Sequence, residues 1–110
     1  MPFISISTPE KILNKESLLE KSTHLIAELT NKSEKFVMVK LNENVHMSFG
    51  GKTACCFVEV KSIGSLNPPI MSQRICELLS SCLGISTDMI YIQFEDINAS
   101  NWGWKSQVFG

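Results

Sequence analysis

Hydrophobic and polar residues in the first third of the chain follow two different spacings. Residues 3–8 carry apolar and hydroxyl side chains in a short run that ends at Pro9, which predicts a strand. Leucines then recur every three or four residues among lysines and glutamates, which predicts an amphipathic helix. Asn14 is a suitable N-cap, and Asn31 marks the end of the helix. The stripe expected to face the core comprises Leu18, Ser22, Leu25 and Leu29, widened by Leu19 and Ile26.

Two further strands are expected in the middle of the chain. Residues 36–41 and 55–63 are rich in residues that favour strands. The polar stretch between them, residues 42–54, contains Gly50-Gly51 and predicts a loop or hairpin connection.

A second helix and a last strand follow. Asn67-Pro68-Pro69 opens the helix, because proline is tolerated in the first turn, and Gly84 stands where helices end. Residues 89–95 predict a strand, and the tail 98–110 holds both tryptophans. The expected apolar stripe of this helix is Met71, Ile75, Leu78, Leu79 and Cys82.

The predicted order is strand, helix, strand, and then the same again. Each half has about 50 residues, the size of a small βαβ unit. We therefore expect an α+β fold of two pseudo-repeated βαβ units in one domain, residues 1–110. Two helices on one face of a four-stranded sheet leave the other face bare. We expect that bare face to be apolar and to be covered by another subunit, which favours an oligomer.

The composition of the chain argues against several classes of function. The net charge of −1 provides no field for binding nucleic acid or an anionic membrane. No apolar run has the length of a membrane span, and no classical secretory signal is visible. We expect a cytoplasmic protein, or one that is secreted without such a signal.

The cysteines and histidines predict neither a disulfide framework nor a metal site. Cys55 and Cys56 are adjacent in a predicted strand, so their side chains point to opposite faces. Cys76 and Cys82 are too far apart on a helix to form a bridge. Buried, reduced thiols are expected. The two histidines, at positions 24 and 46, lack metal-ligand spacing and are expected to be structural or exposed.

Pro2 is the most unusual chemical group that the sequence offers. Removal of Met1 would leave a secondary amine at the start of a strand. In an apolar pocket its charged form loses hydration, so its pKa falls below that of an ordinary α-amino group. A neutral amine near pH 7 is suited to act as a general base. The alternative is that proline only begins an edge strand.

Four other positions have both a chemical and a structural interpretation. Lys32 can bind an anion or cap the preceding helix. Tyr91, with Gln93 on the same strand face, can line a site or pack as ordinary strand residues. A backbone N–H freed at Ser62-Ile63-Gly64 can bind an anion. No nucleophile-elbow, dinucleotide-binding, phosphate-loop or paired-histidine motif is present.

Several short motifs together resemble the macrophage migration inhibitory factor family of the tautomerase superfamily. The resemblance begins at Met1-Pro2-Phe3-Ile4 and Lys32 and extends over nearly the whole length. The remaining matches are Met47-Ser48-Phe49-Gly50-Gly51, Ser62-Ile63-Gly64, Ile85-Ser86-Thr87-Asp88, Tyr91-Ile92, Asp96-Ile97-Asn98-Ala99 and Asn101-Trp102-Gly103-Trp104.

This resemblance implies a fold and an activity. The fold is a homotrimer whose sheets line a central barrel, with helices outside. The activity is keto–enol tautomerisation of phenylpyruvate-like aromatic α-keto acids, or isomerisation of dopachrome-type substrates, without a cofactor.

The resemblance also implies roles for individual residues. Pro2 is the general base and then the acid. Lys32 and the Ile63 N–H hold the substrate carboxylate, and Lys32 lowers the Pro2 pKa further. Tyr91 comes from the adjacent subunit and packs against the aromatic ring of the substrate. The apolar walls are expected to be Phe3, Phe36 and Phe109.

The chain departs from the family pattern at three positions. Gln93 replaces the usual asparagine and reaches one methylene further toward the substrate. Val58 replaces the second cysteine of a Cys-x-x-Cys that begins at Cys55, so a thiol oxidoreductase role is disfavoured. Trp102 replaces a smaller residue and is expected to narrow the pocket rim.

Three hypotheses follow. The first is a cofactor-independent tautomerase, favoured by the joint presence of Pro2, Lys32 and Tyr91. The second is a cytokine-like protein that binds a receptor, with incidental or absent catalysis. The third is a trimeric domain with an inactive pocket.

Overall fold

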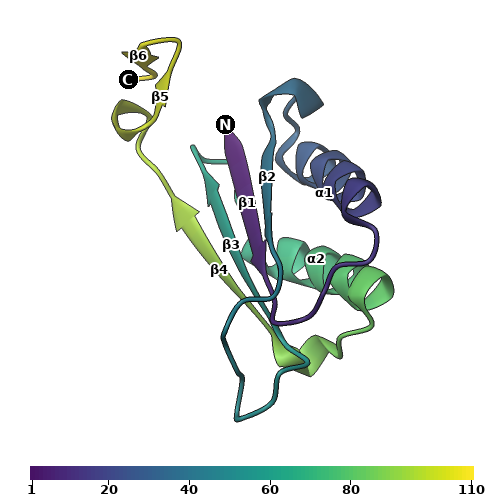
Figure 1. The fold of residues 1–110 in the computed structure, drawn as a ribbon. Helices are drawn as coiled ribbons and strands as arrows, with labels where there is room; N and C mark the ends of the chain where they lie inside the picture. Colours follow the sequence, from purple (N-terminus) through teal and green to yellow (C-terminus); the bar gives the residue numbers. More distant parts are fainter.

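The computed structural model describes all of residues 1–110 and contains two long helices and a four-stranded sheet (Figure 1). Three one-turn 3₁₀ helices and a small C-terminal hairpin complete the chain. In chain order the main elements are β1 (Pro2–Ser7), α1 (Lys15–Thr30), β2 (Met38–Asn42), β3 (Cys56–Ser62), α2 (Pro68–Leu83), β4 (Ile90–Asp96), β5 (Gly103–Trp104) and β6 (Gln107–Val108).

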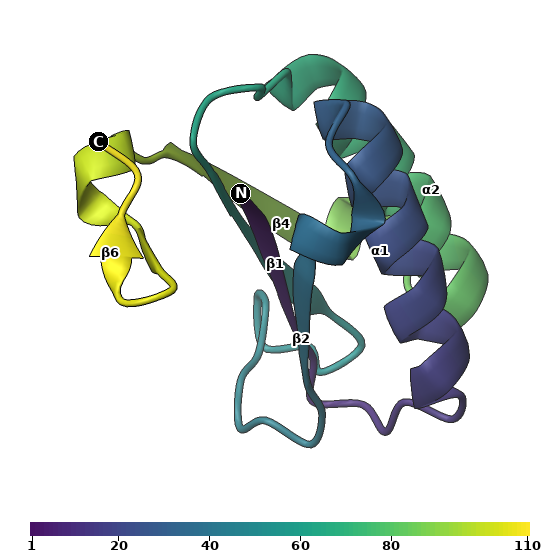
Figure 2. The same cartoon turned by 90° about the horizontal axis from the view of Figure 1, so that it is seen from above.

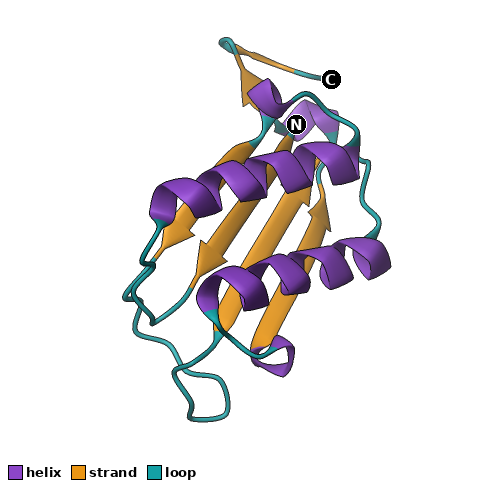
Figure 3. Ribbon diagram, turned by 90° about the vertical axis from the view of Figure 1, so that its right-hand side faces the viewer, coloured by secondary structure: helices purple, strands orange, loops and turns teal.

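The sheet order β2-β1-β3-β4 confirms two βαβ units. β1 pairs with β2 in parallel across α1, and β3 pairs with β4 in parallel across α2. The two units join through an antiparallel pairing of β1 with β3. Seen from above, both helices lie on the same side of the sheet (Figure 2), and they cross it side by side (Figure 3). The α+β class and the placement of the helices are as the sequence predicts.

The core lies between the sheet and the helices. Ile4 and Ile6 of β1 face Val60 and Val58 of β3 in register, and all four are buried. Complete burial of one such side chain contributes about 1.5–3 kcal/mol to stability. The buried residues of the helices include Leu18, Leu25, Ile26, Met71, Ile75 and Leu79.

The structure confirms that the central residues of the two predicted apolar helix stripes are buried. Residues at the edges of the stripes are more exposed than expected. Leu19 is 37% exposed, whereas Ala27 and Thr30 are buried in its place. Leu78 and Cys82 are only half-buried. Since α1 packs against β1 and β2 on one side and against α2 on another, its buried face is wider and turned relative to the leucine stripe.

The helix ends follow their local signals. Asn14 accepts a hydrogen bond from the Ser17 N–H at 3.1 Å and so caps α1. Asn31 and Gly84 end the two helices in the left-handed conformation.

The bare face of the sheet is mostly polar, which corrects the expectation of an apolar face. Its outward positions are set by the alternation of each strand. They comprise Ser5 and Ser7 of β1, Lys40 and Asn42 of β2, Glu59 and Lys61 of β3, and Gln93 and Glu95 of β4. Apolar side chains occur on this face only toward its ends: Phe3 and Met38 at one, Phe57 and Tyr91 at the other.

Two strands begin later than expected. Phe36 lies in a 3₁₀ turn, Glu34–Phe36, and β2 begins only at Met38. Met89 likewise ends a turn before β4. In the tail, for which the sequence predicts no element, β5 and β6 form a hairpin that stands near the N-terminal end of β1 (Figure 1).

Candidate active site

The N-terminus of β1 lies at a hollow that is closed by the C-terminal hairpin. Pro2 is fully buried and pairs in register with Ser62 of β3. The Ser62 hydroxyl is also buried and has no hydrogen-bond partner. Met1 is half-buried and lines two cavities. The first residues of the chain therefore stand at the centre of this hollow.

The first cavity, of about 420 Å³, contains Pro2 in its wall. Phe3, Phe36 and Trp102, which the sequence predicts as apolar walls, line it as well. The other side chains of this wall are not among the site residues predicted from the sequence. They are Lys35, Val37, Met38, Lys61 and Trp104.

The second cavity, of about 390 Å³, is also lined by Met1 and contains Lys32 in its wall. Ile63, Ala99 and Phe109 complete this wall together with Phe36. The backbone N–H of Lys32 donates to Ala27 O at 3.1 Å, so Lys32 helps to end α1 as the structural interpretation expects. Its side chain makes no hydrogen bond or salt bridge, which leaves the ammonium group available to an anion.

The electrostatics of the N-terminus favour a neutral amine. Desolvation by burial lowers the pKa of the Met1 amino group below its usual value, and the positive charge of Lys32 lowers it further. Both causes arise from the walls of the hollow. Pro2, the next residue, is fully buried and lines the first cavity.

A backbone donor also faces this region. The Ile63 N–H takes part in no hydrogen bond of the structure, although it directly follows β3. The next N–H, of Gly64, donates to Asp96 Oδ1 at 2.9 Å. That bond fixes the turn after β3 and leaves the Ile63 N–H as the free donor next to Lys32 in the second cavity.

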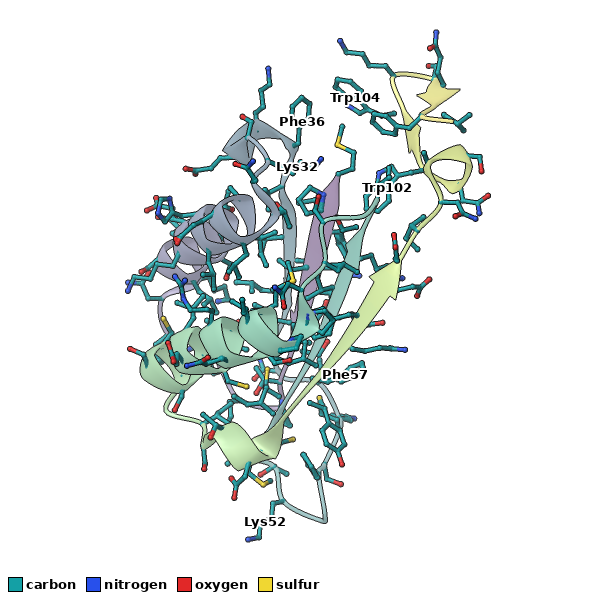
Figure 4. All side chains as sticks on the ribbon, turned by 180° about the vertical axis from the view of Figure 1, so that it is seen from behind. Lys32, Phe36, Lys52, Phe57, Trp102 and Trp104 are labelled. Carbon is teal, nitrogen blue, oxygen red and sulfur yellow. The ribbon has the colours of Figure 1, made fainter.

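The aromatic side chains of the hollow come from distant parts of the sequence. Trp104 contacts Phe36 edge-to-face, with ring centroids 5.7 Å apart, and lies parallel to Phe109 with centroids 6.0 Å apart. In Figure 4 the labelled side chains of Lys32, Phe36, Trp102 and Trp104 gather at one end of the molecule. Only the hairpin fold brings Trp104 here, and no local sequence signal predicts that position.

Tyr91 and Gln93 are not brought to this hollow within one chain. Pro2 stands in register with Ser62 and Asp96, whereas Tyr91 stands beside Phe57 at the opposite end of the strands. Tyr91 is 63% exposed and contacts Phe49 in a tilted arrangement, with ring centroids 4.3 Å apart. Gln93 is exposed on the bare sheet face.

The cysteines and the potential metal ligands of the chain form no second active site. All four cysteines are free thiols, and Cys55 and Cys56 are buried. Burial, with smaller contributions from Cys55 and Cys76, raises the pKa of Cys56 to about 12. No group of three His, Cys, Asp or Glu side chains is arranged to hold a metal ion. Neither helix is long and apolar enough to cross a membrane.

Comparisons with known proteins agree on one family. The sequence model of "Macrophage migration inhibitory factor (MIF)" matches residues 1–110. A MIF homologue of Brugia malayi is 32% identical and is aligned over the full length of both chains. The MIF of Xenopus tropicalis is 32% identical over 86% of this chain and 85% of its own.

Solved structures give the same result. The MIF homologue of Prochlorococcus marinus superposes with a TM-score of 0.92 at 41% identity, covering 98% of this chain and 99% of the other. The MIF of Trichinella spiralis also has a TM-score of 0.92, at 27% identity, with 97% and 99% covered. With the family model matched from end to end and the fold superposed, this chain belongs to the macrophage migration inhibitory factor family.

Proposed function

We propose that the chain, after removal of Met1, is a cofactor-independent tautomerase that interconverts the keto and enol forms of aryl pyruvates. Membership of the MIF family, which in general includes tautomerases, supports the reaction class. The observation that carries the proposal is the position of the chain terminus in a largely apolar hollow. There desolvation, and then the positive charge of Lys32, lower the pKa of the Met1 amino group, and removal of Met1 would free the Pro2 amine in the same hollow.

The proposed reaction moves one proton. The neutral Pro2 amine takes the proton from the carbon next to the carbonyl group of the substrate, and the electron pair of that C–H bond forms the enol double bond. The prolinium ion then returns the proton to the carbonyl oxygen. No electron is lost or gained overall, so no redox partner is required. In the reverse direction the same group acts on the enol.

The substrate carboxylate is assigned to Lys32 and the Ile63 N–H. Both lie in the wall of the second cavity, and neither has a partner within the chain. A carboxylate there would form a charge-assisted hydrogen bond with the ammonium group, the stronger kind of hydrogen bond. The aromatic ring would then lie among Phe3, Phe36, Trp102 and Phe109.

We further propose that the site is completed by a second copy of the chain, in a homotrimer. Tyr91 is exposed and far from its own Pro2, which is the arrangement required if it serves the neighbouring subunit. Gln93 follows on the same face of β4 and would reach the far end of the substrate ring.

Removal of Met1 is the decisive test. While Met1 is present, the Pro2 nitrogen belongs to an amide and cannot accept a proton near neutral pH. Met1 also lines both the cavity that contains Pro2 and the cavity that contains Lys32. We expect the processed form to convert phenylpyruvate and the Met1-retaining form to be slower by at least the ~10²–10⁴-fold that loss of a general base costs.

The two forms can be separated and each confirmed by intact mass before the assay. The matched control is the processed form with its Pro2 amine acetylated, which lacks Met1 but has an amide. Equal turnover by processed and Met1-retaining protein would exclude the Pro2 amine as the base. The receptor-binding alternative stays a separate prediction, tested by direct binding to a purified receptor.

A further inference from the structure

Lys61 is a cation without a partner at the edge of the first cavity. It is half-buried on the outer face of β3, opposite Phe3 of β1 and Glu95 of β4 in register. The structure contains three salt bridges, and Lys61 takes part in none of them, not even with Glu95. A half-buried lysine with no counter-ion is favourably placed to bind an anion that enters the cavity.

The position of Lys61 relative to Pro2 is the second observation. Lys61 and Pro2 line the first cavity, and Lys35 stands in that wall as well. Lys32 lines the second cavity, which shares Met1 and Phe36 with the first. The two cavities at the start of β1 thus have two lysines in one wall and one in the other.

This arrangement of lysines fits a ligand with an anionic group at each of its two ends. A phenylpyruvate-like substrate has one carboxylate, which needs only Lys32. Its ring would leave the half-buried Lys61 beside an apolar group and without a partner, which is unfavourable for a cation. Lys35 is exposed, and its Nζ lies 5.1 Å from the centroid of the Phe36 ring. A ring that carries a second carboxylate would pair with these lysines while Trp102 and Trp104 cover its faces.

We propose that Lys61, assisted by Lys35, is the specificity-determining second anion site of the pocket. The preferred substrates are then aryl pyruvates with a second negative charge at the far end of the ring. This inference rests on the proposed tautomerase function and names its substrate class. Glu95 does not line the cavity and is the competing partner for Lys61.

Two measurements on the Met1-processed protein test it. The first compares kcat/KM for 4-carboxyphenylpyruvate and phenylpyruvate. The second measures binding of their non-reacting analogues, 3-(4-carboxyphenyl)propionate and 3-phenylpropionate, by tryptophan fluorescence. Both tryptophans of the chain line the first cavity, so the signal reports on this site. Binding is measured independently of turnover.

We expect the dianion to bind about 10-fold more tightly than the monoanion, since a charge-assisted contact is lost without the ring carboxylate. Lys61→Met should reduce that preference about 10-fold in both binding and kcat/KM, and Lys61→Arg should retain it. The matched control is Lys40→Met, which removes a lysine from the same sheet face outside both cavities and should leave the preference unchanged.

The outcomes separate the two proposals. If the unmodified protein converts phenylpyruvate but binds dianion and monoanion equally well, the second anion site is refuted. The proposed tautomerase function is then unaffected. A dianion preference that persists in Lys61→Met would overturn the role of Lys61. Tight, Lys61-dependent binding of the dianion without turnover of either substrate would uphold the anion site and refute the tautomerase.

Discussion

At the scale of single residues, the site depends on an amine and a cation that influence each other. Lys32 lowers the pKa of the terminal amine because two positive charges close together are unfavourable. The same charge is the natural partner of a substrate carboxylate. Lys32 therefore has two proposed roles, in binding and in the protonation of the base, and they can be measured separately.

Replacement of Lys32 by alanine tests both roles. Loss of a charge-assisted contact of ~1.5–3 kcal/mol should lower kcat/KM for phenylpyruvate by roughly 10- to 150-fold. Without the neighbouring charge the pKa of the Pro2 amine rises. Since the neutral amine is the active form, the acid limb of the pH–rate profile moves to higher pH. The profile of kcat/KM against pH, measured on processed protein, reports both effects.

Lys21→Ala is the matched control for that experiment. Lys21 lies on α1 about three turns before Lys32 and lines neither cavity at the N-terminus. Its replacement should leave the rate and the profile unchanged. If Lys32→Ala behaves in the same way, Lys32 has no part in the site.

At the scale of elements, β1 is one of the two central strands of the sheet. Its pairing with β3 joins the two βαβ units, and its first residue is the proposed base. Helix α1 covers one face of β1 and ends next to the hollow, where Lys32 follows it. Packing of α1 on the sheet therefore determines where the cation stands relative to the amine.

Truncation of a buried side chain of α1 should destabilise the protein strongly. Ile26 is completely buried in the core, and Ile26→Ala should cost about 2–5 kcal/mol of unfolding free energy. Leu13, just before the helix, is 90% exposed, and Leu13→Ala should change stability by less than ~0.5 kcal/mol. Denaturant unfolding at a fixed protein concentration measures both. Similar losses in the two variants would contradict the packing described here.

At the scale of the whole molecule, the two ends of the sheet have different proposed functions. One end holds Pro2, and the other holds the exposed Tyr91 with Phe49 and Phe57. The bare face between them is polar and offers little hydrophobic burial. Assembly is therefore inferred from the positions of Pro2 and Tyr91 at opposite ends of the strands. A head-to-tail arrangement that closes as a ring brings each Tyr91 end to a neighbour's Pro2 end.

Assembly can be tested by size and by complementation. Light scattering should report about three chains per particle. If Tyr91 acts across the interface, a Met1-retaining chain and a processed Tyr91→Ala chain, each impaired alone, should regain activity when refolded together. Random mixing in equal amounts would restore roughly a quarter of the sites, because each site draws on two chains. A fully active monomer would contradict both the trimer and the shared site.

The sequence by itself determined the features that depend on local rules. Helix caps at Asn14, Asn31 and Gly84 follow from side-chain hydrogen bonding and backbone conformation within one turn. The order of strands and helices follows from the period of apolar residues. Pro2 and Lys32 were candidates because their chemistry is unusual where they stand, and both now lie at one hollow.

Tertiary structure alone decided which distant residues share a surface. The register of β1 with β3 places Lys61 opposite Phe3, and the C-terminal hairpin places Trp104 against Phe36. Neither contact has a local signal, because the partners are separated by long stretches of chain and are joined only by strand pairing and packing. For the same physical reason, only the folded sheet shows that its bare face is polar and that Tyr91 lies at the end opposite Pro2.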